Sequence, residues 1–187
     1  MPDLVAELVA IDAVPSLVER HRASAAARRA AYDAPWTEAV LRVLECGNYR
    51  RLTRHEPGFI ARELGISLEH ERRSLALLCE LGVVRRRGRL YMPVQRSSID
   101  TRGDPARVNA LLEHWSQVGR DRISRRHDYD WYAYNVCSLS AADYERVREL
   151  LRNTFREIRA LVAHTSAEER VALLNLQWLD LAPGPRG

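Results

Sequence analysis

The fold is decided by residues 59–93, which read FIARELGISLEHERRSLALLCELGVVRRRGRLYMP. Their pattern predicts a short helix, a tight turn at Gly65, and a second helix that Ser67 caps and that runs to about Leu81. Glycine suits the turn because it lacks a Cβ atom. Two β-prone runs on either side of an Arg-Gly turn at residues 87–88 then predict a small hairpin.

The outward face of the second predicted helix carries charged and polar residues. Leu75 and Leu78 lie inward at helical spacing, which leaves four positions facing outward. These positions hold Glu69, His70, Arg72 and Arg73. The predicted hairpin adds Arg85, Arg86, Arg87 and Arg89 beside them. Basic residues gathered in this way suit the binding of a polyanion, whereas the simpler interpretation is a solvated basic face with no partner.

Helical patterns also precede this stretch. Residues 4–9 have helical spacing, and residues 16–33 are rich in Ala and Arg. The second segment has too few large apolar residues to form a core alone, so we expect a linker helix or one that packs on another subunit. Residues 36–46 predict a further helix with one apolar stripe. The stripe consists of Trp36, Val40, Val43 and Leu44.

The last third predicts the order α-β-α-β. A helix from Pro105 to about residue 126 precedes residues 131–139, which are aromatic and β-branched over the length of a strand. Ser140 caps the next helix, and residues 171–181 are apolar enough for a strand buried on both faces or for a buried helix. The buried stripe of the first of these helices is predicted to be Val108, Leu111, Leu112, Trp115, Val118 and Ile123.

These elements predict a mainly α protein with small β elements, of the α+β class. The expected organisation is a pair of N-terminal helices as a dimer arm or linker (1–34), the helices with the hairpin (35–96), a polar linker (97–104), the α-β-α-β domain (105–182) and a disordered tail (183–187).

Composition and charge narrow the class of protein. The chain has 187 residues, of which 46% are hydrophobic and 29% charged, as is typical of a globular protein. All 29 basic residues are arginine, and residues 36–103 carry thirteen of them against eight acids, whereas residues 104–187 are neutral. The three scattered cysteines predict neither disulfides nor a zinc site. The start lacks a basic secretory segment and no run could span a membrane, so we expect a cytoplasmic protein without membrane association.

Motifs for catalysis or cofactor binding are missing from the sequence. It contains no phosphate loop, GxGxxG, HExxH or GxSxG motif, so we expect no enzyme activity, no cofactor and no metal. His127, Asp128 and Asp130 cluster, but their sequence is typical of a helix end and a strand entry. Cys137 is expected to be a small buried hydrophobe. The aromatic residues at 131–134 are expected to form a core layer that continues into an interface.

Four features follow one another in this stretch: an LG-[IL]-S turn, leucines at helical spacing, "ELGVV" and "RRRGRLY". In this order they resemble the winged helix-turn-helix domains of bacterial transcription regulators, and the resemblance covers about a third of the chain. The resemblance implies that helix 67–81 enters the major groove of DNA and that the hairpin is the wing, whose arginines contact the DNA backbone. The residues that it implicates in DNA binding are Ser67, His70, Arg72, Arg73, Arg85, Arg86, Arg87 and Arg89.

The C-terminal half is similar to a bacterial domain of unknown function that follows a winged helix in a group of regulators. Residues 104–182 carry this resemblance through "CSLS", "AADYERVRELLRNTFREIRALV" and "ALLNLQWLDL". It implies regulation rather than catalysis and supplies no activity.

Two functional hypotheses follow. The first is a DNA-binding transcription regulator that acts as a homodimer on a two-fold site, with a C-terminal domain that dimerises, senses a small-molecule effector or docks a protein partner. The alternative is a protein-interaction or scaffold module in which the winged helix packs on a partner or on its own dimer mate, a role that the acids Glu69 and Glu71 would suit. An enzyme with a site near Tyr132, His127 and Asp128 ranks last.

Overall fold

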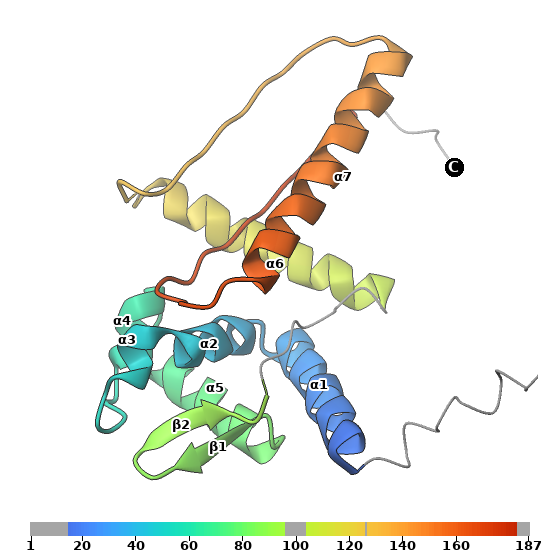
Figure 1. Ribbon diagram of the computed structural model, residues 1–187. Helices are drawn as coiled ribbons and strands as arrows, with labels where there is room; N and C mark the ends of the chain where they lie inside the picture. The colour runs from blue at the N-terminus through green and yellow to red at the C-terminus, as the bar shows by residue number, and fades with distance from the viewer. Residues whose placement is uncertain (1–14, 96–103, 126, 183–187) are drawn as a thin grey trace, which may run out of the picture. The chain divides into compact units, whose positions relative to one another are not determined.

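The computed structural model describes residues 15–95, 104–125 and 127–182 (Figure 1). The helix expected at 4–9, the expected tail at 183–187 and all but the last residue of the expected linker at 97–104 lie outside the described residues. In its described part the protein is mainly helical with a small two-stranded antiparallel sheet, which confirms the α+β class.

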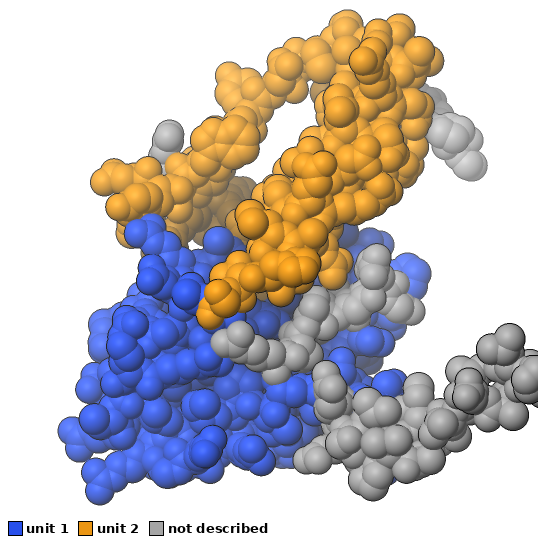
Figure 2. All heavy atoms as spheres, in the orientation of Figure 1, with its two compact units in different colours: residues 1–114, 167–172 blue, residues 115–166, 173–187 orange. Residues whose placement is uncertain are grey.

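The chain divides into two compact units (Figure 2). Unit 1 comprises residues 1–114 and 167–172, and unit 2 comprises residues 115–166 and 173–187. Unit 1 therefore includes the N-terminal helix and half of a later one, both of which the sequence placed outside the domain at 35–96.

Helix α1 (Pro15–Asp33) packs within unit 1 and is not a free linker in this chain. Its small residues make this possible, because Ala27, Ala30 and Ala31 are 2%, 0% and 0% exposed and let the helix approach the core closely. Helix α2 (Trp36–Glu45) follows shortly after α1, and the short helix α3 (Gly47–Arg50) comes next along the chain.

Helices α4 (Phe59–Leu64) and α5 (Leu68–Glu80) form the pair that the sequence predicts. Gly65 lies between them with a φ of 66°, a left-handed conformation that favours glycine. Strands β1 (Val84–Arg87) and β2 (Leu90–Pro93) follow as an antiparallel hairpin in which Val84 faces Pro93 and Arg87 faces Leu90.

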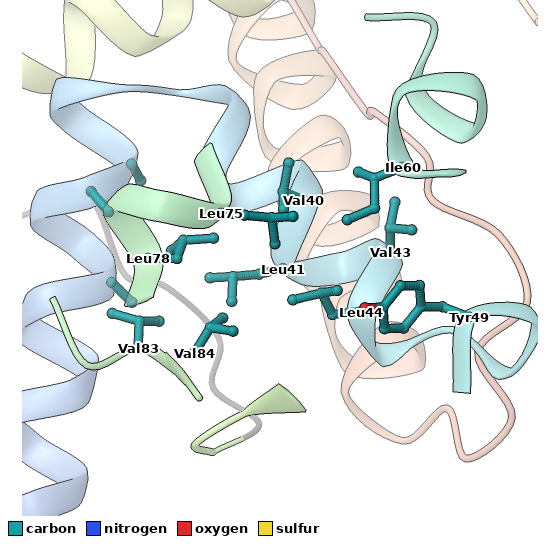
Figure 3. Close-up of a cluster of buried hydrophobic side chains, with 13 residues drawn as sticks. Val40, Leu41, Val43, Leu44, Tyr49, Ile60, Leu75, Leu78, Val83 and Val84 are labelled. Carbon is teal, nitrogen blue, oxygen red and sulfur yellow. The ribbon is translucent and has the colours of Figure 1, made fainter. Parts of the chain in front are cut away.

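The core of unit 1 brings all of these elements together (Figure 3). The predicted stripe of α2 is buried at Val40, Val43 and Leu44, while Trp36 is half-buried. Leu78 of α5 and Val84 of β1 meet the same cluster, so the hairpin is packed directly against α5. The apolar pattern thus packs the hairpin against α5.

The remaining helices are α6 (Pro105–Ile123) and α7 (Ala141–Ala163). Ser140 caps α7 as predicted, since its hydroxyl accepts a hydrogen bond from the Asp143 N–H at 3.1 Å. The predicted stripe of α6 is only partly correct, because Leu111 is buried but Leu112 and Ile123 are 55% and 56% exposed.

The strand predicted at 131–139 and the strand or buried helix predicted at 171–181 are absent from the structure, in which both segments lack regular secondary structure. A strand requires a hydrogen-bonded neighbour. Residues 133–139 and 172–181 form no backbone hydrogen bonds with the described parts of the chain. The α-β-α-β order and the aromatic core layer are therefore wrong for the isolated chain.

No helix within the described ranges has the length and apolar character needed to cross a membrane.

Candidate nucleic-acid interface

The start of α5 is built around a helix cap. Ser67 has extended backbone angles, and its hydroxyl accepts a hydrogen bond from the His70 N–H at 3.1 Å. The same oxygen lies 2.9 Å from Nδ1 of His70, so the two side chains hold each other. Both residues are exposed, as the sequence predicts, and their first task is to fix the start of the helix.

Glu71, treated above as a possible contact to a protein partner, is 0% exposed and belongs to the core. Its Oε1 accepts a hydrogen bond from the Gly58 N–H at 2.7 Å, and its Oε2 accepts one from the Ala61 N–H at 2.6 Å. Gly58 precedes α4 and Ala61 is in its first turn, so this carboxylate of α5 caps α4 from outside. The cap fixes α4 against α5.

Glu71 also begins a chain of polar contacts that reaches the hairpin. Nε2 of His55 lies 3.5 Å from its Oε1, and Nδ1 of His55 lies 3.3 Å from the Tyr49 hydroxyl. That hydroxyl accepts a hydrogen bond from the Tyr91 N–H of β2 at 3.2 Å. The His55 N–H donates to the carbonyl of Arg89 at 2.8 Å, which adds a second tie to the hairpin.

Burial shifts the pKa of two groups in this chain. Desolvation lowers the pKa of His55 below its usual 6.5, with Glu71 opposing the shift and Arg86 adding to it. Desolvation raises the pKa of Tyr49 to about 12. The histidine therefore favours its neutral form, and the phenol keeps its proton throughout the physiological range.

The exposed charges of α5 are not equivalent. Nε of Arg73 donates to Oε1 of Glu69 at 2.6 Å, one turn away, so this pair is internally neutral. Arg72 is exposed and forms no ion pair with the described carboxylates. Of the two acids that α5 carries in its first turn, one is thus buried and the other is paired.

The four hairpin arginines, Arg85, Arg86, Arg87 and Arg89, are all exposed. None of them forms an ion pair with a carboxylate in the described ranges, although Arg86 lies over the Tyr91 ring at 5.8 Å from its centroid. Gly88 makes the tip with a φ of 62°. The hairpin therefore displays four guanidinium groups on a short turn that packs against α5.

His127 and Asp130 take part in a turn that follows α6. The His127 N–H donates to Asp130 at 3.1 Å and Arg122 lies 3.4 Å from the same carboxylate, so the cluster at 127–130 forms a helix-end turn. No group of three potential ligands suited to a metal ion occurs among the described residues. Cys137 was expected to be buried but is exposed, and its segment, residues 133–139, forms no backbone hydrogen bonds with other described residues.

Sequence reasoning missed the cap formed by Glu71. One signal was available: residues 71, 75 and 78 follow helical spacing, which places the carboxylate on the buried stripe of the helix. A buried carboxylate needs hydrogen-bond donors, and the unpaired N–H groups at a helix start are the usual ones. The sequence alone does not show which helix supplies them.

A family model described as "Domain of unknown function (DUF4423)" matches residues 27–181, which spans both units. A search of curated proteins found no match, and a search of solved structures found none.

Proposed function

We propose that this chain, which belongs to the DUF4423 family, binds duplex DNA as a transcription regulator. In this proposal unit 1 acts as a winged helix-turn-helix, α5 lies in the major groove, and the hairpin is the wing. The observation that carries the proposal is the set of four exposed hairpin arginines without described ion pairs, on a hairpin that packs against α5.

The charge balance of α5 supports the proposal. Two acids on a reading helix would repel phosphate, but Glu71 is buried as a cap and Glu69 is paired with Arg73. Among the charged side chains that α5 carries at positions 69–73, Arg72 is then exposed and without an ion pair to the described carboxylates. Arginine is well suited to phosphate because its planar guanidinium donates several hydrogen bonds.

The proposed roles follow from position. Arg85, Arg86, Arg87 and Arg89 would contact the phosphate backbone, which positions the protein without reading sequence. Arg72 and Arg73 would reach toward base edges or phosphates from α5. Ser67 and His70 would fix the start of α5 and approach the DNA backbone at that point. In this assignment the hairpin contributes most of the affinity for DNA, and α5 contributes most of the discrimination between DNA sequences.

The test is a fluorescence-anisotropy titration of labelled duplex DNA at low salt. We expect the variant Arg85/Arg86/Arg87→Ala to lose at least tenfold in affinity. The matched control is Arg146/Arg148/Arg156→Ala, which removes the same charge from exposed positions on α7. Equal losses in the two variants would contradict the assigned face, because they would reflect net charge alone.

A protein-interaction role is the second candidate. It is favoured by Leu68, a large apolar residue that is 38% exposed at the start of α5, and by the internal pairing of Glu69 with Arg73. Absence of duplex binding at low salt, together with a folded unit 1, would favour this alternative.

A further inference from the structure

Most of the large apolar side chains that are exposed in the described ranges lie in unit 2. Of the eighteen large apolar residues exposed in the described ranges, sixteen lie in unit 2. They include Trp131 at 84%, Tyr134 at 96%, Val136 at 78% and Leu181 at 76%. Taking roughly 150–250 Å² for each large side chain, the exposed total is on the order of 2,000 Å².

Two extended segments contribute much of this surface. Every residue of the arm, which we define as residues 131–139, is exposed. The arm runs from the region after α6 to the start of α7, and open space separates its middle from α7 (Figure 2). Its β-branched and aromatic composition is that of a strand, yet residues 133–139 have no backbone hydrogen bonds to other described residues.

The second segment, residues 172–181, is held by its side chains. The amides of Asn175 and Gln177 donate to the Ser116 hydroxyl of α6 at 3.2 and 2.9 Å. Trp178 packs on Tyr144 of α7 with ring centroids 5.2 Å apart. The backbone of residues 172–181 forms no hydrogen bonds with other described residues. Side-chain contacts to α6 and α7 therefore hold an extended segment whose backbone N–H and C=O groups are available to pair with another strand.

We infer that the arm of one copy pairs as a β-strand with residues 172–181 of a second copy, so that two chains share a sheet through unit 2. Each chain then supplies the strand that the other lacks, which is the self-complementarity of a two-fold interface. Two copies contribute four strands and two α7 helices, whereas a single two-stranded ribbon is marginal in water. The inference is independent of the DNA-binding proposal.

Charge and area both favour a second copy as the partner. Residues 115–182 carry ten arginines and ten acidic residues, so two copies do not repel each other. The two segments contain a single charged residue, Asp180, and so offer nothing to select a partner of opposite charge. A stable interface of standard size buries about 800 Å² on each partner, which the exposed apolar surface of unit 2 exceeds.

The experiment uses the full chain in two measurements. Light scattering after size exclusion gives the mass, and hydrogen exchange reports on the amides of residues 133–139. We expect twice the monomer mass of 21.4 kDa and slow exchange in the arm. The variant Val136→Pro removes an N–H from the arm and should halve the mass. The control Asp128→Pro changes the turn at 127–130, where proline is compatible with the second turn position.

Each other result overturns the inference. A monomer with protected arm amides means that the arm pairs within its own chain. A monomer with unprotected amides means that a different partner covers it. A dimer with unprotected amides, or one that survives Val136→Pro, means that the copies meet through another surface. If Val136→Pro loses its helical circular dichroism, Tyr134→Asp replaces it as the variant, because an exposed charge leaves the monomer fold intact while opposing burial.

Discussion

The substitution Glu71→Ala tests the account of how α4 is fixed to α5. It removes the acceptor of two hydrogen bonds, from the Gly58 N–H at 2.7 Å and the Ala61 N–H at 2.6 Å. The Ala61 bond is buried and the Gly58 bond is partly buried, so water can replace the second more easily than the first. Glu71→Ala should therefore lower the free energy of unfolding by a large amount, but by less than the loss of two fully buried hydrogen bonds would.

The magnitude follows from these contacts. An unsatisfied buried N–H costs about 1–3 kcal/mol, and a hydrogen bond to a charged group contributes about 1.5–3 kcal/mol. The one buried methylene that the substitution removes, Cγ, adds roughly 0.8 kcal/mol. Removing the desolvation cost of the carboxylate offsets part of this sum. We expect Glu71→Ala to lower the free energy of unfolding by about 3–5 kcal/mol.

Two further variants sharpen the test. Glu71→Gln keeps the shape and one oxygen acceptor but turns an amide N–H toward a backbone N–H, so we expect a loss of about 1–3 kcal/mol. The control Glu69→Gln lies on the same helix and breaks only the exposed pair with Arg73, for a loss of about 0–0.5 kcal/mol.

The assay is guanidinium denaturation followed by circular dichroism, with hydrogen exchange at the Ala61 amide as the local readout. Exchange there should accelerate in both Glu71 variants and stay unchanged in Glu69→Gln. A Glu71→Ala protein within 1 kcal/mol of the wild type would refute the reasoning, because it would mean that the buried carboxylate is not the cap of α4.

Three other changes test the packing and electrostatics of unit 1. Leu78 is 0% exposed between α5 and the hairpin, so Leu78→Ala should destabilise the protein by about 2–5 kcal/mol in the same denaturation assay, and a loss below 1 kcal/mol would contradict the core assignment. Gly65 has a φ of 66°, so Gly65→Ala should cost about 1–2 kcal/mol, whereas unchanged stability would argue against the left-handed turn. His55 has a lowered pKa, so the unfolded chain takes up a proton at a higher pH than the folded one, and stability should fall as the pH drops below 6.5. An NMR titration of its ring that gives a pKa at or above 6.5 would overturn the last prediction.

The features that local sequence determines were predictable. Ser67 caps α5 and Ser140 caps α7 because a hydroxyl in that position reaches the N–H three residues later, whatever surrounds it. Gly65 ends α4 because its conformation excludes most side chains. The hairpin follows from two β-prone runs around Gly88, and its four arginines are exposed as expected.

Features that depend on distant partners were not predictable. Glu71 acts on Gly58 and Ala61 through the packing of two helices, which spacing within one helix does not reveal. Residues 131–139 have the composition of a strand, but composition specifies neither the neighbour nor whether that neighbour lies in the same chain. The Ala-rich face of α1 looked too small for a core, yet small side chains are what permit its close approach to the rest of unit 1.

The central claim is that the hairpin arginines contact phosphates of duplex DNA, and the salt dependence of binding tests it most directly. The logarithm of affinity falls with the logarithm of salt concentration by about 0.9 for each phosphate contacted. We predict that Arg85/Arg86/Arg87→Ala reduces this slope by about 3, while Arg146/Arg148/Arg156→Ala leaves it unchanged. Equal slopes in the wild type and the hairpin variant would contradict the claim.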